Sequence, residues 1–360
     1  MLTLVGAALA AIPSWTLVGA TLAAIHSCLV RWTKKIAAKA APTLALIALL
    51  TAEAVFADWY SDTQPIMGTR VRVELWHEDP AVAQTLLAAV MGEMRRVDQA
   101  FSPFRDDSEL SELNRSAGGG WVSVSDEMLD LLVKSRQVSE LTRGAFDITY
   151  ASVGRYYDYR ARQRPDDATL AAALEAIDYR HVELDVRGGR VRYRHPNVYI
   201  DLGGIAKGHA VDRGIELLRV AGVSQASVAA GGDSRILGDR RGQPWMVGIK
   251  HPRSEDEMAA VLPLVDTAVS TSGDYERFFE EDGVRYHHIL NPATGDSARD
   301  SMSVTVLGPE ATFTDGLSTS VFVLGPEKGI ELINRLPGID AIIIDAQGNL
   351  LFSEDLDELN

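Results

Sequence analysis

Cysteine is almost missing from this sequence: Cys28 is the only one in 360 residues. A lone cysteine cannot form a disulfide within the chain, and Cys28 lies in an N-terminal segment that we expect to be removed. The remaining body would then hold no thiol, which excludes disulfides, cysteine nucleophiles and cysteine-based metal sites. Any chemistry in that body must come from oxygen and nitrogen groups.

Clustered positive charge is also scarce. The net charge is −15, and four of the basic residues (Arg31, Lys34, Lys35 and Lys39) stand in the first 57 residues against one acidic residue, so the rest of the chain is more acidic still. Nucleic acids and anionic membranes attract clustered Lys and Arg, so we expect no nucleic-acid partner. After residue 58 there is no low-complexity tract, fixed-period repeat or long linker, which predicts one domain over 58–360.

The N-terminus has the order of a targeting segment. The basic stretch "RWTKKIAAKAAP" precedes the apolar "TLALIALLTAEAVFA", which ends at Ala57 with Val55 two positions earlier. This order is typical of a secretory signal cleaved before Asp58, so we expect 1–57 to be an apolar segment and signal peptide, and the protein to be exported to the periplasmic side of the inner membrane. An uncleaved anchor helix, a lipid on Cys28 and a translation start near Leu29 or Val30 stay open as alternatives.

Helical and strand patterns are mixed along the body. "TRVRVELWH" alternates as a strand does, whereas "PAVAQTLLAAVMGEMRRVDQAF" has helical periodicity. A second helix is expected from the N-cap Ser125 to a stop at Gly144. Further strands are expected at "VYIDL", "ASVAAGG", "WMVGIKHP", "TAVSTSG", "HHIL", "SVTVLG" and "AIIIDAQGNLLFS". Because helices and strands do not alternate strictly, we predict a single α+β domain of mixed layers.

A glycine-rich junction, "VYIDLGGIAKGHAVDRG", draws attention as a ligand site. Asp201 ends the expected strand, Gly203 and Gly204 allow close backbone approach, and Lys207 begins the expected helix. The segment fits neither standard phosphate-loop pattern. The alternative is a tight turn followed by a solvated lysine.

Oxygen ligands recur on one helical face of "FTDGLSTSVFVLG". We expect Thr314 to cap this helix, which places Asp315, Ser318 and Thr319 at i, i+3 and i+4. Carboxylate and hydroxyl oxygens suit Mg²⁺. Alternatively, Asp315 only favours the helix dipole.

Two further segments hold candidate groups. In "RYHHILNPATGD", neighbouring residues of a strand point to opposite faces, so only one of His287 and His288 can face a given site. Most histidines are surface or core residues, and this alternative stays open here. "TRGAFDIT" places a glycine, an aromatic residue and a carboxylate in a loop after a helix.

Taken together, these segments resemble the ApbE family of FAD:protein FMN transferases from about Pro65 to the C-terminal region. The matching segments, in the family's order, are "PIMGTRVRVEL", "FSPFRDDSELSELNRSAG", "GAFDIT", "IDLGGIAKGHAVD", "AAGGDSRILG", "PWMVGI", "AVSTSGDYERFF", "HHILNPATG" and "TDGLSTSVFVLG".

The resemblance implies an activity and a site. Members move the FMN half of FAD onto a Thr or Ser hydroxyl of a partner protein with the help of Mg²⁺, forming a phosphoester and releasing AMP. The histidine expected to act as base matches His288. Residues implied to line the FAD site are Met67, Phe104, Ala145, Phe146, Asp147, Asp201, Lys207 and Ile289. Residues implied to hold Mg²⁺ are Gly204 through its carbonyl, Asp315 and Thr319, with Ser318.

The sequence departs from the family's pattern at several places. Asn291 stands for a usual Asp, Phe104 for a Tyr and Gly316 for an Ala, and "YASVGRYYDYRARQ" replaces the usual continuation after "GAFDIT". The first two changes bear on FAD affinity and acceptor choice, and Gly316 loosens a first helical turn.

The chain lacks an obvious acceptor signature of its own, an Asp-Gly-x-Ser/Thr-Gly-Ala-Ser/Thr run, so we expect it to modify another protein. By resemblance to the family, that protein is a membrane redox subunit or an exported flavoprotein. Three alternatives remain: a pyrophosphatase that cleaves FAD to FMN and AMP, a non-enzymatic flavin-binding protein, and an electron-transfer flavoprotein.

Overall fold

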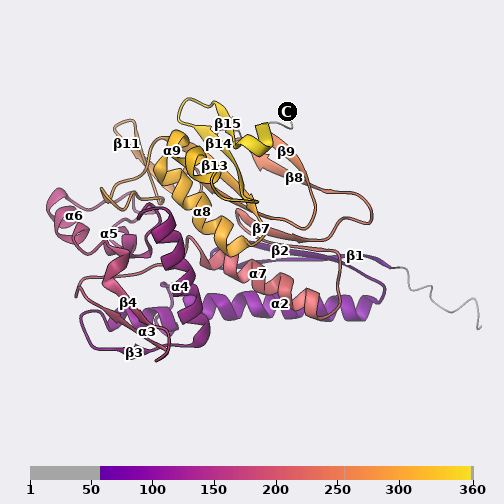
Figure 1. Cartoon of the computed structure of the whole chain (residues 1–360), viewed down its shortest axis with the longest axis horizontal. Coiled ribbons are helices and arrows are strands. Elements are labelled where there is room, and N and C mark those ends of the chain that lie inside the picture. The colour runs from indigo at the N-terminus through magenta and orange to yellow at the C-terminus, as the bar shows by residue number, and fades with distance from the viewer. Residues whose placement is uncertain (1–56, 255, 358–360) are drawn as a thin grey trace, which may run out of the picture. The chain divides into compact units, whose positions relative to one another are not determined.

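The computed structural model describes residues 57–254 and 256–357 (Figure 1). Its central feature is an eight-stranded sheet in which each strand runs antiparallel to its neighbours. In spatial order the strands are β1 (Asp58–Ile66), β2 (Thr69–His77), β6 (Ala226–Ala230), β7 (Asp233–Leu237), β10 (Ala268–Gly273), β13 (Ser301–Gly308), β14 (Asp340–Asp345) and β15 (Leu350–Phe352).

The alternation in β2 shows that one face of this strand is covered and the other is open. Val71, Val73 and Leu75 are fully buried, whereas Arg70 before them and Arg72 between the two valines are exposed. Burial of three large apolar side chains contributes about 1.5–3 kcal/mol each relative to exposure. The strand predicted from this pattern is confirmed.

Helices pack against the sheet, each over particular strands. They are α2 (Pro80–Phe101), α7 (Ala206–Val220), α8 (Ala311–Leu324) and α9 (Pro326–Ile333). Helix α2 contacts β1 and β2, α7 contacts β6 and β7, α8 contacts β10 and β13, and α9 contacts β14. Consecutive helices also contact one another, so the apolar core lies between a helical layer and the sheet.

The remaining elements build a smaller region and two hairpins. A three-stranded sheet has the order β3-β5-β4, and α4 joins it to the main layer by contacting both β4 and α8. The mixture of helices and strands is the α+β arrangement that the sequence predicts. The bounds are α3 (Glu109–Arg115), β3 (Val122–Ser123), α4 (Asp126–Leu141), η1 (Ile148–Tyr150), α5 (Ala151–Gly154), α6 (Asp167–Leu174), η2 (Tyr179–His181), β4 (Val182–Asp185), β5 (Arg190–Tyr193), β8 (Trp245–Lys250), β9 (Met258–Leu264), β11 (Phe278–Glu281), β12 (Val284–His287) and α10 (Glu354–Asp357).

Both ends of α4 follow the predicted signals. The Ser125 hydroxyl accepts a hydrogen bond from the Met128 N–H at 3.1 Å, which satisfies a donor of the first turn. Beyond the last turn, the Gly144 N–H donates to the Ser139 carbonyl at 2.8 Å, and Gly144 has a φ of 84°. A positive φ favours glycine, so this residue stops the helix as expected.

Three local predictions are wrong. Residues 198–200 form no strand, because side chains of other segments take their backbone groups: Ile200 is bonded through both its N–H and its carbonyl to Asn114. Helix α8 begins at Ala311, so Thr314 lies inside its first turn and does not cap it. The strand expected at "HHIL" ends at its first residue, His287.

The predicted signal segment, the lipid alternative on Cys28 and the alternative start sites lie outside the described residues. The body from Ala57 to Asn360 forms one compact unit, and cleavage before Asp58 stays a prediction. Among the described residues, no helix is both long and apolar enough to span a bilayer.

Candidate active site

The glycine-rich junction brings α7 and α8 into close contact. A Cβ atom built at Gly204 would lie 3.3 Å from the Thr319 hydroxyl oxygen, and one at Gly208 would lie 2.1 Å from the Ala311 carbonyl oxygen. A side chain at Gly208 would therefore push the two helices apart. Because the contact is made, the Gly208 N–H donates directly to the Asp315 carboxylate at 3.0 Å.

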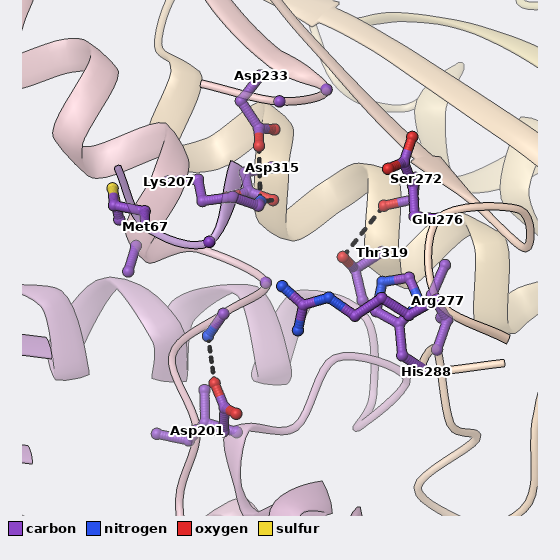
Figure 2. A pocket seen from close by; sticks show the side chains of 18 of the residues that line it. Met67, Asp201, Lys207, Asp233, Ser272, Glu276, Arg277, His288, Asp315 and Thr319 are labelled. Carbon is purple, nitrogen blue, oxygen red and sulfur yellow. Dashed lines mark hydrogen bonds and ion pairs between the residues drawn. The ribbon is translucent and has the colours of Figure 1, made fainter. Parts of the chain in front are cut away.

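Lys207 lies between two carboxylates at this contact (Figure 2). Its Nζ is 2.6 Å from Asp233 Oδ2 and 3.2 Å from both carboxylate oxygens of Asp315. The carboxylate side chains are 2% and 3% exposed, and the lysine side chain 28%. Three elements meet here, since Asp233 begins β7, Lys207 lies in the first turn of α7 and Asp315 lies in α8.

Two buried carboxylates share one ammonium group, so this cluster lacks one positive charge. Burial lowers the pKa of Lys207, but the charges of Asp233 and Asp315 together outweigh burial and raise the pKa above its usual range, so the lysine stays charged. Burial, followed by the charge of Asp233, raises the pKa of Asp315 to about 7, although Lys207 opposes the shift. A buried carboxylate in this position takes up a proton or a cation.

The oxygen atoms near Asp315 fit a hard cation such as Mg²⁺. The carboxylate, the Thr319 hydroxyl on the next turn and the nearby Gly204 backbone are the groups that the resemblance implies as ligands. No cluster of three His, Cys, Asp or Glu residues arranged for a metal occurs in the described part of the chain. A cation here would draw on hydroxyl and carbonyl oxygens as well, which suits Mg²⁺.

Ser318 does not face the same space as Thr319. Its hydroxyl is 2.9 Å from the Ser272 hydroxyl and donates to the Asp315 carbonyl at 3.0 Å. The side chain is fully buried and does not line the cavity. In this structure Ser318 therefore joins α8 to β10.

The adjacent histidines point to opposite sides, as predicted for strand neighbours. His287 is buried, donates from Nε2 to the Ala298 carbonyl at 2.6 Å and accepts at Nδ1 from the Ile289 N–H at 3.3 Å. His288 is half-buried, faces the cavity, and its Nδ1 has no hydrogen-bond partner among the described residues. Burial, followed by the charge of Arg277, lowers the pKa of His288 to about 3, so the ring is neutral at physiological pH.

A cavity of about 500 Å³ connects these groups. Twelve of the thirteen predicted site residues line it, all except Ser318: Met67, Phe104, Ala145, Phe146, Asp147, Asp201, Gly204, Lys207, His288, Ile289, Asp315 and Thr319. They come from segments far apart in the sequence, and the fold brings them to one side of the α7–α8 contact.

Individual lining residues differ in what they offer a ligand. Phe104 is 82% exposed, so its ring is free to cover a bound molecule. The Asp147 carboxylate is occupied by hydrogen bonds from the Thr149 N–H and hydroxyl and the Tyr179 N–H, at 2.6–2.8 Å, and so holds its own loop. Asp201 accepts from the Gly203 N–H at 2.6 Å, and burial raises its pKa.

Met67 is held in an unusual backbone conformation. It has a φ of 56° and the next residue, Gly68, a φ of 68°, between strands β1 and β2. Two consecutive positive φ values define a type I′ hairpin turn, for which Asn-Gly is favoured. A methionine there is strained, and such strain clusters at functional sites.

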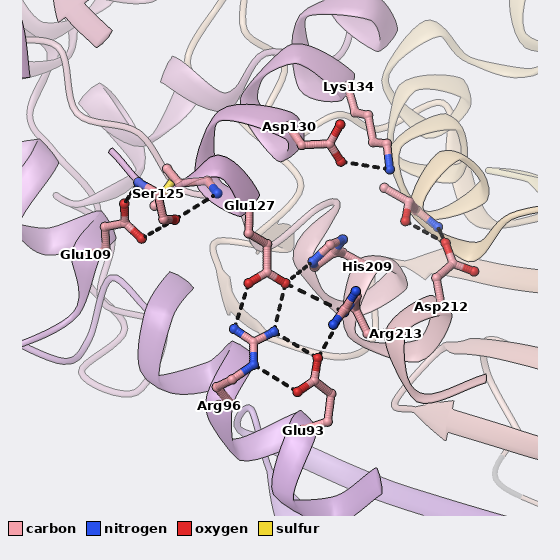
Figure 3. Close-up of polar contacts among 12 residues, drawn as sticks. Glu93, Arg96, Glu109, Ser125, Glu127, Asp130, Lys134, His209, Asp212 and Arg213 are labelled. Atoms are coloured by element: carbon pink, nitrogen blue, oxygen red, sulfur yellow. Dashed lines mark hydrogen bonds and ion pairs between the residues drawn. The ribbon is translucent and has the colours of Figure 1, made fainter. Parts of the chain in front are cut away.

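Charged contacts fix α7 to the two helices beside it (Figure 3). His209 Nε2 lies 2.8 Å from Glu127 of α4, and Glu127 also accepts from Arg96 of α2 at 2.6 Å. Arg213, one turn further along α7, donates to Glu93 of α2 at 2.9 Å. These contacts set the position of the helix that carries Lys207.

The charged lining residues that were not predicted from the sequence are Asp98, Glu276, Asp233 and Arg277, and the last two contact or face the groups described above. Both lie in segments that carry the family resemblance, "AAGGDSRILG" and "AVSTSGDYERFF". An acidic residue after a glycine pair, and a basic residue eleven positions before a candidate base, were the available signals. Neither signal by itself indicates whether the side chain faces the cavity.

A cavity that combines a neutral imidazole with a carboxylate–ammonium cluster has the groups of an enzyme that transfers a phosphorus-centred group. Comparison with known proteins gives the family. A model of the ApbE family matches residues 67–343. The chain is 35% identical over 306 residues to an FAD:protein FMN transferase of Treponema pallidum, covering 79% of this chain and 84% of the relative. A Vibrio cholerae relative of the same name is 32% identical over 284 residues, covering 76% and 84%.

Solved structures agree with this assignment. The ApbE protein from Thermotoga maritima superposes with a TM-score of 0.77 at 35% identity, covering 84% of this chain and 99% of that one. The apo flavinyl transferase ApbE of Pseudomonas stutzeri gives 0.75 at 30% identity, covering 84% and 97%. The chain therefore belongs to the ApbE family. The predicted family, enzyme class and fold are confirmed.

Proposed function

We propose that this protein transfers the FMN half of FAD to a Thr or Ser hydroxyl of an acceptor protein. The observation that carries the proposal is the placement of the neutral His288 in the same cavity as the Lys207–Asp233–Asp315 cluster. The family relatives named FAD:protein FMN transferase support the choice of donor and product.

Each of several cavity residues would have its own role in the transfer reaction. The acceptor oxygen forms a bond to the FMN phosphorus, the pyrophosphate P–O bond breaks, and AMP leaves with the bonding electrons. His288, whose ring is neutral, takes the proton of the acceptor hydroxyl. Lys207 contributes a fixed positive charge beside the pyrophosphate, and the open ring of Phe104 covers part of the flavin nucleotide.

We further propose that Mg²⁺ binds at Asp315, Thr319 and the Gly204 carbonyl, with Ser318 supporting the site from behind. When bound, the ion offsets negative charge on the pyrophosphate. Asp315 supplies the charged oxygen, and the shortage of positive charge around it favours cation binding.

The site of action stays as the sequence suggests: export to the periplasmic side of the inner membrane, with a membrane redox subunit or exported flavoprotein as acceptor. Protein isolated from an exporting host is expected to begin at or near Asp58. N-terminal sequencing that finds residues before Arg31 intact would contradict the cleavage.

Mass spectrometry of a candidate acceptor after incubation with this protein, FAD and Mg²⁺ tests the transfer directly. We expect one added FMN per modified acceptor and an equal amount of AMP. His288→Ala should keep FAD affinity and lose transfer by roughly two to four orders of magnitude. The matched variant His287→Ala should affect transfer much less, because that ring faces away from the cavity.

AMP released at an undiminished rate without any acceptor would identify water as the nucleophile, and the pyrophosphatase alternative would replace the transferase. If His288→Ala fails to bind FAD, the histidine is a binding group and its role as base is wrong. If it transfers FMN as fast as the parent, the base lies elsewhere.

A further inference from the structure

Arg277 stands beside His288 on the hairpin formed by β11 and β12. Phe278 pairs with His287 in this ladder, and the His288 N–H donates to the Arg277 carbonyl at 3.2 Å, so Arg277 lies opposite His288. Residues opposite each other on antiparallel strands project to the same face. The hairpin therefore presents a guanidinium and an imidazole side by side to the cavity (Figure 2).

The guanidinium of Arg277 reaches across the cavity. A Cβ atom built at Gly68, in the turn between β1 and β2, would lie 3.7 Å from Arg277 Nη2. The charge also acts on both sides of the cavity, because it lowers the pKa of His288 and opposes the rise in the pKa of Asp201. The side chain thus spans from the base to the opposite wall.

Arg277 differs from the other lining cation in its partners. Lys207 is bonded to two carboxylates, whereas Arg277 donates no side-chain hydrogen bond and forms no ion pair within the described residues. Several other arginines are paired, such as Arg235 with Asp212 and Arg253 with Asp274. A planar group with five donors that is held at a cavity without a protein partner is suited to an anionic ligand with several oxygens.

We propose that Arg277 is a catalytic residue that binds the pyrophosphate of the dinucleotide donor and stabilises the phosphoryl oxygens during transfer. The proposal rests on the proposed function and adds to it the group that contacts the transferred phosphorus centre from the hairpin side. Lys207 and the Asp315 site lie on the opposite, helical side. The phosphoryl group would be held between the two, next to His288.

A comparison of FAD binding with riboflavin binding tests whether Arg277 contacts the pyrophosphate or another part of the ligand. FAD carries the pyrophosphate and riboflavin carries none, so Arg277→Met should weaken FAD binding about 10- to 100-fold, the range for hydrogen bonds to charged groups, and riboflavin binding less than about twofold. Quenching of flavin fluorescence measures both. Arg277→Lys should retain part of the FAD affinity, because it keeps the charge and loses the paired donors.

Turnover should fall by at least about 100-fold in Arg277→Met and less in Arg277→Lys. The matched control is Arg187→Met, which replaces an exposed arginine of the β4–β5 loop and should change neither binding nor turnover. Melting temperatures of all three variants should stay near the parent value, since Arg277 makes no side-chain hydrogen bond or ion pair with the residues that the structure describes.

Equal weakening of FAD and riboflavin binding by Arg277→Met would overturn the proposal, because the arginine would then contact the ring. Parental affinity and turnover in Arg277→Met would overturn it as well. The proposed function can fail separately: if the parent protein never transfers FMN, the activity is wrong, whereas a selective loss of FAD over riboflavin binding still establishes the pyrophosphate contact.

Discussion

Asp212 of α7 is predicted to fix the start of α8 and with it the position of Asp315. Its carboxylate, labelled in Figure 3, accepts from the Thr312 N–H and hydroxyl at 2.8 and 2.5 Å. It also accepts from the Ala311 N–H at 2.9 Å and from Arg235 at 2.7 Å. The first N–H groups of a helix have no partner within it, so this carboxylate from another helix caps α8.

Replacing Asp212 by Ala removes the cap and leaves Arg235 unpaired, although the arginine side chain is only 18% exposed. Breaking a largely buried charge pair on one side costs about 3–5 kcal/mol. At about 2–4 °C for each kcal/mol, the scale for large domains, the melting temperature should fall by roughly 6–20 °C. Asp212→Asn should fall less, because one acceptor oxygen remains.

Thermal unfolding followed by circular dichroism measures these shifts, with and without Mg²⁺. Because Asp315 lies one turn after the capped residues, the variant should also lose most of the stabilisation expected from Mg²⁺ at the proposed Asp315 site. The double variant Asp212→Ala/Arg235→Ala should be less destabilised than the sum of the single variants. A melting temperature of Asp212→Ala within about 2 °C of the parent would refute this account of the cap.

Further expectations concern the cavity itself. Lys207→Met should raise Mg²⁺ affinity about tenfold in the absence of FAD, because it removes a competing positive charge next to Asp315, and it should lower FAD affinity. Calorimetric titration with Mg²⁺ measures the gain in Mg²⁺ affinity. An unchanged Mg²⁺ affinity would argue against competition between the lysine and the ion. Asp315→Asn should melt higher than the metal-free parent at pH 8 and by less at pH 5. The reason is that the pKa of Asp315 is about 7 in the folded protein and lower in the unfolded chain, so the folded protein loses stability as the pH rises from the lower pKa to the higher one. Equal differences in melting temperature between variant and parent at both pH values would show that the pKa of Asp315 is not perturbed. Met67→Asn should stabilise the protein by about 1 kcal/mol in urea unfolding and weaken FAD binding, because it relieves the positive φ and removes an apolar side chain; lower stability would show that the methionine packing outweighs the strain.

The sequence predicts elements best where local signals act alone. The alternation in β2 and the Ser125 and Gly144 signals of α4 correspond to what the structure shows, because each depends on residues within one element. The start of α8 was misplaced because its cap comes from Asp212, about a hundred positions earlier. Residues 198–200 were misassigned for the same kind of reason, since Asn114 binds their backbone.

In the candidate site, too, the features set by distant contacts could not be predicted from local sequence. The family resemblance supplied twelve residues that line one cavity, although spacing alone could not have brought segments so far apart together. Ser318 was assigned to the metal because it shares a helical face with Asp315, whereas packing against Ser272 turns it into the protein. The placement of Arg277 opposite His288 follows from the pairing of β11 with β12, and the register of that pairing cannot be predicted from the sequence of either strand alone.

Within the described residues, β11 and β12 pair only with each other and not with the eight-stranded sheet. His288, which follows β12, and Arg277, which precedes β11, thus flank a hairpin that shares no ladder hydrogen bonds with the eight-stranded sheet among the described residues. If His288 and Arg277 act as we propose, changes in the length and sequence of this hairpin would alter which acceptor reaches the cavity while the sheet, α7 and α8 stay intact. On the proposed function, a protein built in this way would take a new acceptor without a change in its sheet.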